Sequence, residues 1–157
     1  MPQGRQTVLV GGLAQTLDEA VVPGPDGRVQ GWERAEWPRA DDVAKENGLS
    51  AARFTAIGAF SDATLGYFDM EKKEYEEIPV DEQVEVLSLV GDIALFEGEP
   101  KLHAHAVLGR SDGTTRGGHL LGAHVQPTLE VVIVESPEHL RRETDEETGL
   151  PLLAVRD

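Results

Sequence analysis

The stretch LHAHAVLGRSDGTTRGGHLL, residues 102–121, predicts two neighbouring strands joined by a tight turn. Ser-Asp-Gly at positions 111–113 separates the two halves. A three-residue hairpin loop usually ends in a left-handed residue, most often glycine, and Gly113 occupies that position. We therefore expect Arg110 to face Thr114 across the turn and the two strands to pair in antiparallel fashion.

That register would bring three imidazoles to one place. His103 and His105 are two residues apart in one strand, so their side chains share a face. His119 then stands directly opposite His105, with His103 one diagonal step away. A two-residue loop at positions 112–113 would instead turn His119 to the other face, because a one-residue slip reverses every side chain.

Three neutral imidazoles at such spacings suit a divalent transition metal, and zinc is the ion we expect. Glu130, in the next predicted strand, is a candidate fourth ligand or an acceptor that holds a ligand imidazole, and pairing with a buried arginine is an equal alternative. The alternative for the histidines is a hydrogen-bonded or interfacial role without metal. The odd spacing of His124 from His119 places it on the opposite face, and we expect no role for His139.

Apolar and β-branched runs place the two hairpin strands at residues 102–108 and 118–125 and predict further strands at residues 7–10, 52–60, 63–70, 75–78, 84–96 and 128–134. One helix is predicted over residues 41–47, with aspartates at its start and Gly48 as its left-handed cap. This combination predicts an α+β fold, in which a single main helix packs on a largely antiparallel sheet of about seven strands.

Length and composition predict one globular domain over residues 1–157. The chain is 39% hydrophobic and 27% charged, and it contains no cysteine, which excludes disulfides and thiolate metal sites. Its core is expected over residues 41–135, after an unusual turn-rich segment at 11–40 and before an acidic tail at 136–157. No apolar run is long enough to span a membrane or to form a signal peptide, so we expect a cytoplasmic protein.

Charge argues against direct DNA binding. The chain has 29 acidic and 14 basic residues and a formal net charge of −15. Affinity for nucleic acid comes largely from lysine and arginine at the phosphates, and a field of this sign repels them. Residues 100–130 are nearly neutral, and they contain four of the five histidines.

Four segments in this order resemble the PPC (plant and prokaryote conserved) domain: Glu85–Asp92 (EVLSLVGD), Leu102–His105 (LHAH), Gly117–Leu120 (GGHL) and Thr128–Val132 (TLEVV). The upstream stretch at 52–60 is similar to the first central strand of that domain. The resemblance covers about residues 41–135 and implies a compact α+β domain of the standalone bacterial type. It also implies a homotrimer.

The resemblance extends to function. In plants the domain follows an AT-hook and assembles with itself and with transcription factors, and bacterial members carry a provisional DNA-binding label. The histidines of the two short motifs, here His103, His105 and His119, are implied metal ligands. No AT-hook is present in this chain. We therefore expect a metal-binding assembly or regulatory module, with itself and a regulatory protein as partners. A metal-dependent enzyme that uses an open three-histidine site on a small substrate is the alternative.

Overall fold

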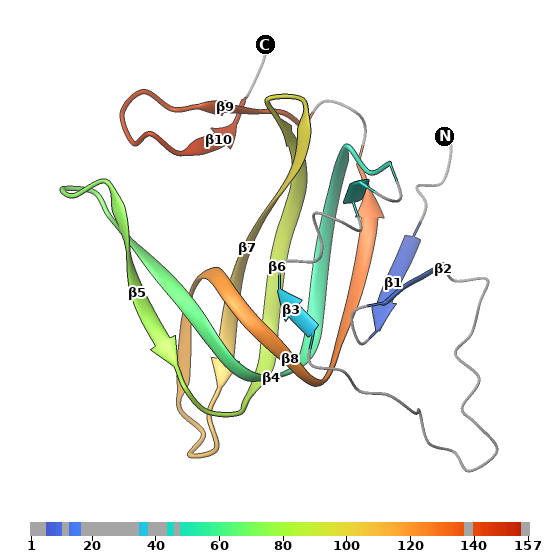
Figure 1. Ribbon diagram of the computed structural model, residues 1–157, viewed down its shortest axis with the longest axis vertical. Coiled ribbons are helices and arrows are strands. Elements are labelled where there is room, and N and C mark those ends of the chain that lie inside the picture. The colour runs from blue at the N-terminus through green and yellow to red at the C-terminus, as the bar shows by residue number, and fades with distance from the viewer. Residues whose placement is uncertain are drawn as a thin grey trace.

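The structure, a computed structural model, describes residues 6–10, 13–16, 35–37, 44–45, 48–136 and 140–154. Its described strands are β1 (Gln6–Val10), β2 (Leu13–Thr16), β3 (Ala35–Trp37), β4 (Ala51–Asp69), β5 (Glu74–Val80), β6 (Val84–Phe96), β7 (Glu99–Gly109), β8 (Thr115–Glu135), β9 (Arg142–Thr144) and β10 (Pro151–Leu153). Figure 1 shows the long strands β4, β6, β7 and β8 at the centre of the molecule.

The main sheet has eight strands, in the order β2-β1-β8-β7-β6-β4-β5, with β3 paired to β8. All of its pairings are antiparallel, as the sequence predicts. β8 also pairs with β4, so the pairings β4–β6–β7–β8–β4 close into a ring. The ring turns one face of each of these strands inward, toward a shared apolar interior.

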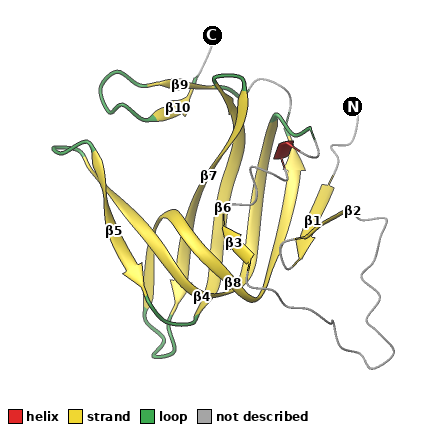
Figure 2. Ribbon diagram, in the orientation of Figure 1, coloured by secondary structure: helices red, strands yellow, loops and turns green. Residues whose placement is uncertain are grey.

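The predicted α+β class is wrong, because the described chain is almost entirely sheet (Figure 2). Ala44 and Lys45 are its helical residues, and the rest of the helix predicted over 41–47 lies outside the described residues. The physical reason lies in the ring of strands. Strands that enclose their own apolar face need no large helix to cover it.

Two pairs of predicted strands are continuous. The segments at 52–60 and 63–70 form the single strand β4, and those at 118–125 and 128–134 form β8. Between the two predicted segments, each strand continues with shifts in its pairing register and does not form a turn. Gly58 makes this possible in β4, because its φ is +148° and a Cβ there would lie 2.3 Å from the carbonyl oxygen of Thr128.

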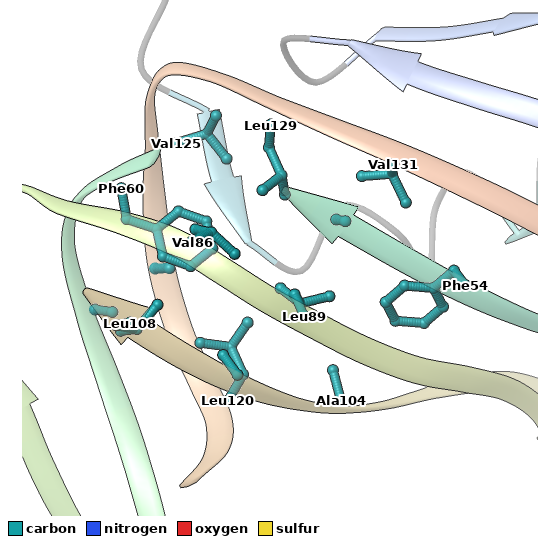
Figure 3. Close-up of a cluster of buried hydrophobic side chains, with 14 of the residues drawn as sticks. Phe54, Phe60, Val86, Leu89, Ala104, Leu108, Leu120, Val125, Leu129 and Val131 are labelled. Carbon is teal, nitrogen blue, oxygen red and sulfur yellow. The ribbon is translucent and has the colours of Figure 1, made fainter. Parts of the chain in front are cut away.

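The core fills the inside of the ring (Figure 3). It is built from alternate residues of four strands, among them Phe60, Leu89, Leu108 and Ile133, each at most 1% exposed. In β7 the inward residues are Ala104, Ala106 and Leu108. The alternating histidines of β7 are therefore left on the outer face.

Residues 140–154, which the sequence suggested were part of an acidic tail, form the hairpin β9–β10. Leu95 of β6 pairs with Arg141 in a parallel bridge, which attaches the hairpin to the main sheet. The loop of this hairpin also meets the turn between β4 and β5, where the Lys73 ammonium donates to the carbonyl oxygen of Glu147. The hairpin β9–β10 and the turn between β4 and β5 lie at the upper left in Figure 1. Among the described residues there is no helix with the length and apolar character needed to cross a membrane.

Candidate metal centre

The turn between β7 and β8 has the predicted three-residue form. The backbone N–H of Arg110 donates to the carbonyl of Thr114 at 2.9 Å, and Gly113 is left-handed with a φ of +81°. The carboxylate of Asp112 accepts from the backbone N–H of Thr114 at 2.9 Å and so stiffens the loop. In this register His105 pairs directly with His119, which confirms the predicted pairing.

The three histidines of this hairpin converge. The ring centroids of His103, His105 and His119 lie 5.0 to 5.3 Å apart in each of the three pairs. One ring nitrogen from each residue lies within 4.8 Å of the others. The Nδ1 atom of His119 is buried and has no hydrogen-bond partner within the described chain. An imidazole-only donor set of this size fits a zinc-class ion, and a buried nitrogen without a partner fits a ligand role.

Burial lowers the pKa of two of these imidazoles, those of His103 and His119. Desolvation lowers the pKa of His119 to about 4, with further lowering from the neighbouring His103 and His105. Desolvation also lowers the pKa of His103, and the positive charge of Arg142 acts in the same direction, while Asp92 opposes it. A neutral imidazole offers a lone pair to a metal, so the lowered pKa values of His103 and His119 favour their ligating form at neutral pH.

A buried arginine from the C-terminal hairpin lies close to the cluster and lines the same pocket. Arg142 is 6% exposed, and its guanidinium donates to the carbonyl of Pro151 at 2.8 Å and to the carboxylate of Asp92 at 2.5 Å. The other oxygen of Asp92 is 3.9 Å from Nδ1 of His103. Asp92 therefore lies between the arginine and the first histidine. Our sequence reasoning missed both residues, although a lone aspartate within the apolar strand β6 signals a need for a cationic partner.

A pocket of 690 Å³ opens beside the histidines. One wall is aromatic: Tyr75 of β5 stacks on His119, with ring centroids 4.6 Å apart and planes at 28°. Another part of the wall comes from the C-terminal hairpin, through Leu150 and Leu152. The cluster is thus partly buried, yet one side of it remains accessible to a small molecule.

The other candidate residues lie elsewhere. Glu130 is exposed on β8, opposite Val10 and Ile57, and does not join the histidine group. His124 forms a pair with Asp62, with Nδ1 and Oδ1 2.6 Å apart. His139 lies outside the described residues.

A family model and solved structures both match this chain, and they point to the same family. The model of the Plants and Prokaryotes Conserved (PCC) domain matches residues 41–137. A plant- and prokaryote-conserved (PPC) protein of Pyrococcus horikoshii is 30% identical, with a TM-score of 0.79, over 99% of this chain and 94% of that one. No curated protein matches the chain.

Two further solved structures carry more specific names. A protein of Archaeoglobus fulgidus, named as metal-containing, is 32% identical with a TM-score of 0.76, over 98% of this chain and 95% of that one. A protein of Bacteroides thetaiotaomicron, provisionally named as DNA-binding, is 30% identical with a TM-score of 0.73, over 76% and 85% of the two chains. Together with the family match over more than half of the sequence, these likenesses show that the chain belongs to the PCC (also written PPC) domain family.

Proposed function

We propose that this chain is a metal-binding PPC module in which His103, His105 and His119 hold one divalent transition metal, with zinc the preferred ion. The observation that carries the proposal is the convergence of three imidazole nitrogens within 4.8 Å beside a pocket. The similarity to a relative named as metal-containing supports it. The donor set contains no carboxylate, which argues against magnesium and calcium.

All three histidines line the pocket, so an ion that they hold would be accessible from it. When bound, the metal supplies a Lewis-acid position at which a small ligand or a water molecule binds. The chain itself supplies the orientation, because Asp92 lies beside His103 and Tyr75 stacks on His119.

Metal content of the purified protein tests this proposal. The chain should be produced without a polyhistidine tag and without a nickel column, and its metal measured by elemental analysis. We expect close to one zinc ion per chain, which His119→Ala removes. His124→Ala is the matched control and should retain the metal, because His124 pairs with Asp62. A metal content far below one ion per chain would contradict the proposal.

We further propose that the module assembles with itself as a homotrimer, as the family resemblance implies. Support comes from exposed apolar side chains on the outer face of β6 and β7, where Leu87 is 54%, Val90 50% and Val107 42% exposed. Such a strip is typical of an interaction surface. Sedimentation of the wild type and of Val107→Glu tests this idea. A monomer in the wild-type sample would refute it.

An enzyme is the second candidate, because the pocket gives a small molecule access to the histidine cluster. Hydrolysis of an activated ester by the zinc-loaded protein, compared with His119→Ala, would separate this candidate from a purely binding role. A rate equal in the two proteins would exclude hydrolysis of that ester at the cluster.

A further inference from the structure

The pocket differs in charge from the rest of the molecule. The whole chain carries a formal net charge of −15, yet the residues that line the pocket include no aspartate and no glutamate. The charged side chains in its lining are Lys101 and Arg142. A concave site that is locally positive within a negative protein favours an anionic ligand and concentrates it there.

The two cations differ in availability. Arg142 is buried and already donates to Asp92 and to the carbonyl of Pro151. Lys101 is exposed and forms no ion pair with a carboxylate in the described part of the chain. Its ammonium lies 5.2 Å from the centre of the ring of Phe96, a residue outside the pocket lining, in a cation–π contact. Lys101 is therefore the lining cation that has no carboxylate partner in the described chain and can receive a ligand's charge.

Lys101 also lies in register with the histidines. It precedes His103 by two residues in β7, so both side chains project from the same outer face of the strand. The line Lys101, His103, His105 thus runs along one side of the pocket. The ammonium and the imidazoles therefore border the same pocket.

The remaining walls are largely apolar. Phe68, Tyr75, Leu102, Leu150 and Leu152 contribute to the lining. The volume of 690 Å³ falls within the range of pockets that bind small organic molecules. A bare inorganic anion would leave these apolar surfaces in contact with water, whereas an organic anion would cover them.

We infer that the pocket binds a small organic carboxylate, with its charged end toward Lys101 and the histidine cluster and its apolar body between the aromatic wall and the C-terminal hairpin. This inference rests on the proposed metal site and names its ligand class. A carboxylate is favoured over a phosphate because, apart from the metal, the lining offers one cation that is not paired with a carboxylate, while phosphate sites usually gather several donors.

Calorimetry on the zinc-loaded protein tests the inference with three probes of similar size: 3-phenylpropionate, its neutral amide and phenyl phosphate. We expect the carboxylate to bind at least about tenfold more tightly than the amide, a difference of about 1.4 kcal/mol. Lys101→Met should weaken carboxylate binding by a similar factor while zinc content stays unchanged. Lys72→Met, which removes an exposed lysine in the turn after β4, is the matched control and should bind as the wild type does.

The outcomes separate the two proposals. If the protein takes up no zinc, the metal site itself is wrong. If zinc is bound but the amide binds as tightly as the carboxylate, or Lys101→Met has no effect, the carboxylate inference alone is overturned. Tighter binding of phenyl phosphate than of the carboxylate would also overturn it. Thermal unfolding of each variant checks that the fold is retained, as the exposed position of Lys101 leads us to expect.

Discussion

The guanidinium of Arg142 donates to the carboxylate of Asp92, and this bond joins the C-terminal hairpin to the strand beside the histidine cluster. Arg142 is buried with its side chain 3% exposed, whereas the side chain of Asp92 is 22% exposed. The carboxylate in turn lies 3.9 Å from His103. Asp92 thus links Arg142 of the C-terminal hairpin to His103, and both of these residues line the pocket.

We expect Arg142→Met to destabilise the protein by about 2 kcal/mol, since it removes a charge-assisted hydrogen bond and leaves Asp92 without its buried partner. Urea unfolding measures this loss. Hydrogen exchange should show faster opening of residues 140–154, because the bonds of Arg142 to Asp92 and Pro151 hold this hairpin. Arg141→Met alters the exposed neighbour and should leave both quantities nearly unchanged. Unchanged hydrogen exchange in the Arg142 variant would show that these bonds do not hold the hairpin in place.

The metal-free protein should lose stability as the pH falls from about 6.5 to about 4. The folded state lowers the pKa of His119 to about 4, so over this interval the unfolded chain takes up a proton that the folded chain does not. The folded state is therefore penalised as the pH falls. Urea midpoints at pH 7 and pH 5 measure the loss, which should be smaller in His119→Gln. An equally steep fall in that variant would show that other groups cause it.

Gly113→Ala should destabilise the protein by about 1 kcal/mol. The cost is backbone strain alone, because the φ of Gly113 is +81° and no atom lies within 4 Å of an added Cβ. Gly122→Ala is the control, since its surroundings are equally open and its φ is not left-handed. Thermal unfolding compares the two variants, and equal midpoints would mean that the turn does not depend on the glycine.

Gly91→Ala should affect both stability and metal binding. An added Cβ would lie 2.3 Å from the carbonyl oxygen of His103 and 2.4 Å from the Phe54 ring, so β6 and β7 would have to move apart. Overpacking of this kind costs about 1–3 kcal/mol. Because the displaced carbonyl belongs to His103, we also expect weaker zinc binding, measured by competition with a chelator. If Gly91→Ala binds zinc as tightly as the wild type does, the backbone movement does not reach the three histidines.

The chain alone should not retard duplex DNA in a gel-shift assay at moderate salt. Its net charge of −15 opposes the phosphate backbone, so we expect a role at DNA only through a partner protein. A basic PPC protein that carries an AT-hook would serve as the positive control. Tight binding by this chain would overturn the argument from charge.

The histidine hairpin could be predicted from sequence because its information is local. The position of Gly113 in the turn fixes the pairing of His105 with His119, and strand periodicity adds His103. Few alternatives exist once the loop length is known, so local turn chemistry suffices.

Other features depend on contacts between distant segments. The turn-like residues near Asp62 and Pro127 suggested strand ends. Both strands continue, because the residues before and after each interruption pair with neighbouring strands. The main helix was expected because single-strand patterns do not reveal that a sheet will close on itself. The pairing of Arg142 with Asp92 joins positions that no local pattern connects. The pocket could not be predicted for the same reason.

The histidine hairpin and the pocket around it close chain loops of different length. His103, His105 and His119 belong to one hairpin with a short loop, so they can come together at a small entropic cost early in folding. The pocket around them also requires β4, β5 and the C-terminal hairpin. Contacts between these elements and the histidine hairpin close much longer chain loops. An ion could therefore be captured by a nascent chain before the cavity that will surround it exists.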